Sequence, residues 1–238
     1  KGFKVHISEN CLGVENYFSG SVSERLVDFQ NALNDPDVKA IVCARGGYGC
    51  VQLVDKVQWA NSLLTPKWIV GFSDVTVFHQ RVNILGNNSI HGTMPLNFET
   101  NSPEALQTLV DALTGHPYSI VTSAHPKNTL GKAKGRLLGG NLSILYSLLG
   151  TNDQVDYSNS ILLVAKIDVE NLPSGEDSKS RLDDGDLMIK GNVIDAVTVI
   201  VDSENASLVA HANVDDNSVV ATGVTTTNPV PASATTAT

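Results

Sequence analysis

The chain has 238 residues, of which 42% are hydrophobic, and its 16 Lys and Arg against 25 Asp and Glu give a formal net charge of −9. This acidic balance, without a cluster of basic residues, argues against nucleic acid or an anionic membrane surface as partner. No apolar stretch reaches the roughly 18 residues of a membrane span, and the start at Lys1 lacks the basic and apolar regions of a signal peptide. We therefore expect a cytoplasmic protein without a membrane partner.

The length allows one large domain or two small ones with a real hydrophobic core, so a disulfide framework is not needed. The three cysteines, Cys11, Cys43 and Cys50, lack zinc-type spacing and fit a reducing compartment. Cys43 lies in an apolar run, where a small buried side chain is the expected role. We expect no metal and no cofactor.

The first half of the chain alternates apolar runs with amphipathic stretches, separated by short turns. Ser21 or Ser23 can cap the first helix, and Ser102 followed by Pro103 opens another. We expect strands at 4–7, 39–44, 68–72 and 89–91 and helices at 21–34, 51–57, 75–85 and 102–113. Strands and helices in this alternation predict a parallel sheet with crossover helices.

The second half is less regular. Residues 117–134 are typical of a linker, which gives an N-terminal domain at 1–116 and a C-terminal domain at 135–238. Within the latter we expect a helix capped by Asn141, a buried strand at 161–165, and strands at 193–201 and 207–214. The Thr-, Ala- and Pro-rich tail from about residue 225 is expected to be poorly ordered.

The first candidate site is Ser73, in the run Gly71-Phe72-Ser73-Asp74. An apolar strand that leads directly into a serine and then a helix is the arrangement of a nucleophile elbow. The turn raises the hydroxyl above the carboxyl end of the sheet, where helix N–H groups can hold a developing oxyanion. The alternative is that Ser73 only caps the helix, and Val75 stands where the generic motif has its second glycine.

Two glycine-rich junctions accompany this serine. Arg45-Gly46-Gly47-Tyr48-Gly49 follows a predicted strand, and its arginine could pair with a carboxylate. Gly139-Gly140-Asn141-Leu142-Ser143 leads into a helix and could supply a substrate contact from the second unit. The alternatives are a tight turn and a simple helix cap. Because ligands bind at the carboxyl ends of strands in an open α/β sheet, we expect Ser73 and the first junction to face one cleft.

Four runs in this order and spacing resemble the LD-carboxypeptidase family of serine peptidases, which includes the muramoyltetrapeptide carboxypeptidases and the microcin-C immunity peptidases. They are Ala44–Gly49, Gly71–Thr76, His91–Met94, and Gly139–Ser143 followed by Gly150-Thr151. The resemblance implies a flavodoxin-like parallel α/β domain and a smaller β-rich C-terminal α/β domain, with the active site between them. It implies hydrolysis of an L,D peptide bond that releases a terminal D-amino acid from muropeptides, as in peptidoglycan recycling.

The resemblance also implies roles for individual residues. The family's nucleophile falls on Ser73, and its oxyanion hole falls on the backbone N–H groups of Gly47 and Asp74. The family's substrate-side asparagine falls on Asn141. From the residues themselves, apart from the resemblance, we also expect substrate contacts from Arg45, Gly46 and His91. His79, in the helix after the serine, is expected to be packed, whereas His91 could line the cleft. A homodimer is a further, weaker implication.

A Ser–Glu–His triad in that chain order completes the implied site. The glutamate's position falls on Ala165, and the nearest glutamates downstream are Glu170 and Glu176, of which we take Glu170 as the candidate. The candidate base is His211, the one histidine after residue 125, whose alternative is a place inside a strand. A serine without its base is a weak nucleophile. Two other functions therefore stay open: an inactive or truncated relative that binds peptide termini, and a flavodoxin-like ligand-binding module.

Overall fold

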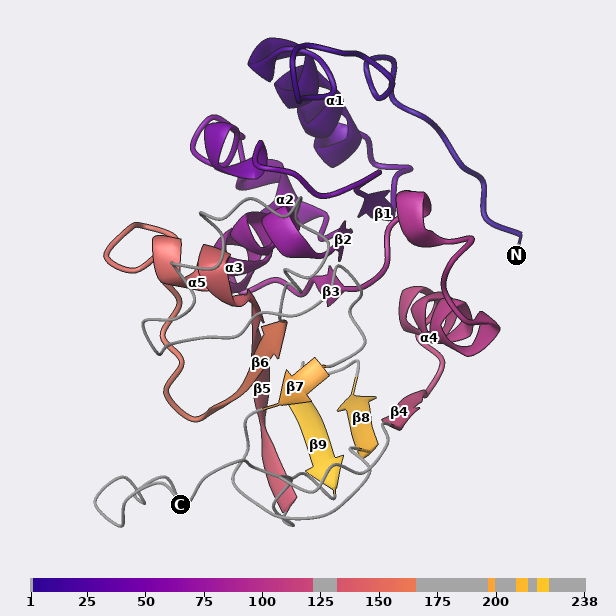
Figure 1. Cartoon of the computed structure of the whole chain (residues 1–238), viewed down its shortest axis with the longest axis vertical. Helices are drawn as coiled ribbons and strands as arrows, with labels where there is room; N and C mark the ends of the chain where they lie inside the picture. Colours follow the sequence, from indigo (N-terminus) through magenta and orange to yellow (C-terminus); the bar gives the residue numbers. More distant parts are fainter. Residues whose placement is uncertain (1, 122–131, 166–196, 200–208, 214–217, 223–238) are drawn as a thin grey trace, which may run out of the picture.

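The computed structural model describes residues 2–121, 132–165, 197–199, 209–213 and 218–222 (Figure 1). The N-terminal elements form one group and a larger sheet forms another, with helices α3 and α5 lying where the two groups meet (Figure 1). Among the described residues no helix has both the length and the apolar character needed to cross a membrane.

A three-stranded parallel sheet forms the centre of the N-terminal part. Its strands are β1 (Ala40–Val42), β2 (Trp68–Gly71) and β3 (Ile90–His91), in the order β1-β2-β3. The helices that connect and follow them are α1 (Val22–Asn34), α2 (Ala60–Leu64), α3 (Thr76–Ile84) and α4 (Pro103–Thr114), with 3-10 turns η1 (Cys50–Gln52), η2 (Ser73–Val75) and η3 (Pro95–Asn97). The predicted alternation and the parallel sheet are confirmed.

Aromatic side chains from three segments pack together in the core of this part. The rings of Phe29 on α1 and Phe78 on α3 stack at 4.6 Å, and Trp59 meets both rings edge-on. All three are buried, with Ile69 of β2 beneath them in the same apolar cluster. Burial of this cluster fixes α1 and α3 against the sheet, and α3 is the helix that follows Ser73.

The local start and stop signals act as the sequence predicts. Ser21 caps α1 and forms a reciprocal capping box with Glu24. Ser102 caps α4 through the N–H of Ala105, and Gly115 ends that helix in the left-handed conformation at φ 72°. These features are decided within a few residues, which is why a sequence reveals them.

A six-stranded sheet forms the second part, in the order β4-β8-β9-β5-β6-β7. Within this sheet, β5 and β6 are the only described neighbours that pair in parallel, and the other described pairs are antiparallel. The strands are β4 (Ser119–Val121), β5 (Lys132–Asn141), β6 (Ser160–Ala165), β7 (Val197–Val199), β8 (Val209–Asn213) and β9 (Ser218–Thr222), and helix α5 (Leu142–Ser147) follows β5 directly. The chain is therefore a mixed α/β protein with a β-rich second part, as expected.

Several predicted elements differ from the structure. Residues 4–7 form no strand, because each of them is exposed and none pairs with a described strand. The helix expected at 51–57 is wrong: η1 is followed by turns that bury Leu53, Val54 and Val57 without helical repetition. Strand β9 was not predicted, and β4 with the start of β5 falls inside the expected linker. The domain boundaries themselves stay a prediction, and the tail from about 225 lies outside the described residues.

Helix α3 joins the two parts through a polar stripe. Gln80 donates from Nε2 to the carbonyl of Gly139 in β5 at 2.9 Å and accepts from the Tyr157 hydroxyl at 2.8 Å. One helical turn earlier, the Thr76 hydroxyl accepts the N–H of Asn141 at 3.0 Å. Thr76 and Gln80 are spaced i and i+4, so they lie on the same face of α3. That face docks on the end of β5.

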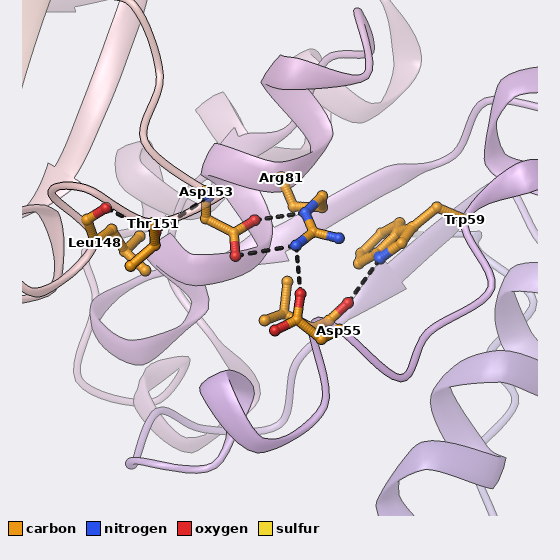
Figure 2. A network of polar contacts seen from close by, with 7 residues as sticks. Asp55, Trp59, Arg81, Leu148, Thr151 and Asp153 are labelled. Atoms are coloured by element: carbon orange, nitrogen blue, oxygen red, sulfur yellow. Dashed lines mark hydrogen bonds and ion pairs between the residues drawn. The ribbon is translucent and has the colours of Figure 1, made fainter.

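An ion-pair network lies beside this stripe (Figure 2). The Arg81 guanidinium bonds both carboxylate oxygens of Asp153, at 2.5 and 3.1 Å, and reaches Asp55 at 2.7 Å. The Asp153 carboxylate is 6% exposed whereas that of Asp55 is 74% exposed. The hydrogen bonds that Arg81 donates to the Asp153 carboxylate raise the pKa of Arg81. The bidentate pair therefore links α3 to the loop after α5.

Asp153→Ala is expected to lower the free energy of unfolding by about 2–4 kcal/mol, because it leaves the half-buried guanidinium without its enclosed partner. Asp55→Ala is the matched control, since it removes a carboxylate from the same arginine at the surface, where a pair contributes about 0–1 kcal/mol. Urea denaturation followed by circular dichroism measures both. Equal effects of the two substitutions would show that the Asp153 pair does not join the two parts.

Candidate active site

Ser73 occupies a strained turn between β2 and α3, which we call the serine elbow (residues 71–75). Its φ is +59°, in the left-handed region that residues other than glycine rarely adopt. Such strain costs about 1–3 kcal/mol and persists only where the surroundings enforce it. A Cβ at Gly71 would lie 2.8 Å from the Val75 side chain, so glycine is needed for the strand to turn this sharply. The elbow predicted from the sequence is confirmed.

The glycine-rich loop lies directly against the serine. A Cβ built on Gly46 would sit 3.3 Å from Ser73 Cβ and 3.6 Å from its Oγ, with the Met94 methyl at 3.7 Å. The N–H of Leu96 donates to the Ala44 carbonyl at 3.2 Å, which ties the segment after β3 to the same loop. The loops that follow β1, β2 and β3 therefore meet around Ser73, as expected for the carboxyl edge of a parallel sheet.

Asp74 joins two of these loops through its side chain. It is 4% exposed, and its Oδ2 accepts the N–H of Cys50 at 2.9 Å. Burial, followed by the nearby Asp74 carboxylate, raises the pKa of Cys43 to about 12 and that of Cys50 well above its usual value. Both thiols are therefore protonated at neutral pH. Sequence reasoning assigned Asp74 only a backbone role, because nothing in the sequence indicates which loop its carboxylate contacts.

Arg45 extends away from the sheet toward the N-terminal segment. Its Nη2 donates to the Tyr17 carbonyl at 2.8 Å. It helps to line an open cavity of about 580 Å³, together with residues of 11–19 and with Pro95 and Leu96. Ser73 is not among the lining residues. The cavity lies next to the glycine-rich loop, because Ala44 and Arg45 line it and Gly46 lies against Ser73. Pairing of Arg45 with a substrate carboxylate stays a prediction.

His91 lies deeper than the cleft-lining position expected for it. Neither of its ring nitrogens is open to solvent, and neither finds a hydrogen-bond partner among the described residues. Burial, followed by the charge of His79, lowers the pKa of His91 to about 3. His79 is buried as predicted, and burial lowers its pKa to about 4. Both imidazoles are therefore neutral at pH 7 and lie inside the protein.

Asn141 is the N-cap of α5, with its Oδ1 accepting the N–H of Ile144 at 3.2 Å. It is 2% exposed and lies in register with Ala165 on the neighbouring strand. The capping role is confirmed, while contact with substrate stays a prediction. Through Thr76 this residue also lies close to the serine elbow.

Close approach between the two parts depends on Gly140, whose φ is +141°. A Cβ there would lie 2.5 Å from both Cγ2 and Oγ1 of Thr76. Gly140→Ala is expected to destabilise the protein by about 2–4 kcal/mol, from overpacking together with backbone strain. Gly86→Ala is the control, because its φ is also positive but its Cβ would meet open space. Thermal melts that show equal losses would contradict the tight contact.

The other two triad candidates are not brought to the serine by the described structure. Glu170 lies outside the described residues. His211 belongs to β8, between β4 and β9, where its backbone pairs with Ser119 and Val220. That position agrees with the alternative of a strand residue, and its catalytic role stays a prediction. Within the described ranges, no three His, Cys, Asp or Glu side chains are grouped so as to hold a metal ion.

A parallel α/β sheet with a strained serine at its carboxyl edge has the nucleophile elbow that serine hydrolases use. The family model described as the LD-carboxypeptidase N-terminal domain matches residues 1–92, and that of the LD-carboxypeptidase C-terminal domain matches residues 134–179. The two stretches cover more than half of the chain. The chain therefore belongs to the LD-carboxypeptidase family.

Individual proteins agree with this assignment. A candidate carboxypeptidase of Synechocystis is 34% identical over 70% of this chain and 54% of its own length, and the murein tetrapeptide carboxypeptidase of Pseudomonas aeruginosa is 31% identical over 63% and 52%. This chain thus spans about half the length of the curated relatives it matches. The crystal structure of muramoyltetrapeptide carboxypeptidase from Oxalobacter formigenes has the same fold, with a TM-score of 0.61 and 22% identity over 92% of this chain and 88% of that one.

Proposed function

We propose that this protein is a serine carboxypeptidase that hydrolyses an L,D peptide bond and releases the terminal D-amino acid of a muropeptide. The observation that carries the proposal is the strained Ser73, held at φ +59° with the backbone of Gly46 against its side chain. The names of the relatives from Pseudomonas and Oxalobacter, a murein and a muramoyl tetrapeptide carboxypeptidase, support the choice of substrate.

In the proposed reaction Ser73 Oγ attacks the carbonyl carbon of the scissile bond, and a general base takes the hydroxyl proton. The N–H groups of Gly47 and Asp74 would stabilise the oxyanion, since such donors contribute the largest part of the rate in acyl transfer. The amine of the D-amino acid leaves with that proton, and water then releases the peptide from the acyl-enzyme. Glu170 and His211 are the proposed partners of Ser73 in the triad.

Release of D-alanine from a muropeptide tetrapeptide ending in D-alanine tests this function directly. Product is measured as free alanine by chromatography, which detects both enantiomers. The matched control is the same peptide with terminal L-alanine, which we expect to be cleaved at least about 100-fold more slowly because the carboxylate and methyl exchange places in the site. Equal cleavage of the two peptides would contradict L,D specificity.

A second function, binding of peptide termini without hydrolysis, is favoured by one observation. Ala165 ends β6 and pairs with Asn141 on β5. It is buried and stands where the resemblance places the family's glutamate, so this position supplies no carboxylate to the triad. Under this alternative the muropeptide binds, as isothermal titration calorimetry would show, but no D-alanine appears. A cytoplasmic location and a homodimer stay predictions of the same proposal.

A further inference from the structure

The carbonyl of Gly71, two residues before Ser73, accepts two hydrogen bonds. The backbone N–H of Gly92, just after β3, donates one at 3.1 Å. His79 Nε2 donates the other at 2.9 Å. A carbonyl can only accept, so Nε2 of His79 carries a hydrogen. Burial lowers the pKa of His79 to about 4, so the ring is neutral at pH 7 and Nδ1 carries no hydrogen.

The His79 bond spans the serine elbow from one arm to the other. Gly71 ends strand β2, and His79 lies one turn into helix α3, eight positions later, so the bond closes a loop that contains Ser73. The strained φ of Ser73 requires surroundings that hold both arms in place. A bond directly between the two arms, below the serine, supplies that restraint.

An ordinary packing role does not account for His79. Its Nδ1 and both nitrogens of His91, whose ring centre lies 5.8 Å away, are buried without a hydrogen-bond partner among the described residues. A buried polar atom without a partner destabilises the folded state, and an apolar side chain of the same size would avoid that cost. The protein therefore bears an energetic cost next to the elbow.

We propose that His79 is a positioning residue for Ser73, holding the Gly71 carbonyl so that the serine hydroxyl keeps its attacking orientation. His91, packed against the open side of the His79 ring, keeps that ring in place. This inference rests on the proposed serine chemistry and adds a residue that acts through the backbone, without touching the substrate. A hydrogen-bond donor that reaches the Gly71 carbonyl from position 79 is then a requirement for the nucleophile's geometry.

Three substitutions at His79 separate the hydrogen bond from the volume of the side chain. In His79→Gln the amide Nε2 can donate at the place of the imidazole Nε2. In His79→Met the volume is similar but no donor exists, and in His79→Asn the amide is too short to reach Gly71. Asn83→Ala is the matched control in the same helix. It removes the 2.8 Å bond from Asn83 Nδ2 to the backbone carbonyl of His79 and the 3.5 Å bond that Asn83 Oδ1 accepts from Arg136, and it keeps the bond between His79 and Gly71.

The readout is the rate at which a fluorophosphonate labels Ser73, as its Oγ–P bond forms and fluoride leaves. We expect His79→Met and His79→Asn to label at least about 30-fold more slowly, because small displacements of a reacting group cost up to about 100-fold. His79→Gln and Asn83→Ala should stay within about threefold of the native rate. Turnover of the tetrapeptide should follow with a lower kcat and an unchanged KM.

A folded His79→Met with the native labelling rate would overturn the inference, as would a His79→Gln variant as slow as His79→Met. If His79→Met does not fold, the Gln and Asn variants decide, and equal labelling rates for those two would overturn it. A native protein that does not label at Ser73 contradicts the serine chemistry itself, and the positioning role fails with it. Failure of the inference alone leaves native labelling intact.

Discussion

Ser73→Ala is expected to abolish release of D-alanine, lowering kcat by at least about 10³-fold, while the peptide still binds with a similar Kd. The Oγ of Ser73 is the nucleophile that forms the acyl bond, and alanine has no atom that can replace it. The substitution removes one atom, and no described hydrogen bond of the elbow involves Ser73 Oγ, so we expect the packing of the elbow to stay unchanged. Turnover and calorimetric binding, measured on the same sample, check both parts.

The control for this substitution concerns the backbone strain. Alanine at φ +59° carries the same strain as serine, so the melting temperature should stay within about 2 °C. Ser73→Gly removes the strain and should be no less stable than Ser73→Ala, yet equally inactive. Turnover that survives either substitution would remove Ser73 from the mechanism.

Acidification is expected to destabilise the protein steeply between about pH 6 and pH 4, through His79 and His91. Their pKa values in the folded protein are about 4 and about 3, against 6.5 in the unfolded chain. In this window the unfolded state binds more protons than the folded state, so a falling pH favours unfolding. The free energy of unfolding should drop by about 1.4 kcal/mol per pH unit for each histidine.

Urea denaturation between pH 7 and pH 4 measures this slope. Desolvation is the main cause of both shifts, and the charge that acts on His91 is that of His79, with no carboxylate of the described residues contributing to either pKa. His79→Gln should therefore reduce the slope by about half, and Asn83→Ala should leave it unchanged. A slope unaffected by His79→Gln would show that other groups govern the acid transition.

The serine elbow could be predicted because its requirements are local. A strand of buried residues, a glycine at 71 that admits the sharp turn, and a helix starting directly after Ser73 all lie within one short run. The glycine-rich loop at 45–49 was likewise recognisable, and the carboxyl edge of a parallel sheet brings it to the serine. The same local signals place the caps at Ser21, Ser102 and Asn141.

The sequence could not reveal how distant groups pair. The Asp74 carboxylate meets Cys50, His79 holds the Gly71 carbonyl, and Arg81 pairs with Asp153, which is 72 residues away. Each of these side chains lies in a segment where its type has several ordinary roles. The choice between them depends on which loops the sheet and the docking of α3 bring together.

The sequence by itself determined the class of fold, the elbow and the family, because periodicity, glycine positions and motif spacing are properties of short segments. Only the tertiary structure decided that His79 and His91 lie buried and neutral beneath the serine, since burial depends on everything packed around a ring and not on its neighbours in the chain. It also decided that Thr76 and Gln80, on one face of α3, fix the C-terminal sheet next to the serine elbow.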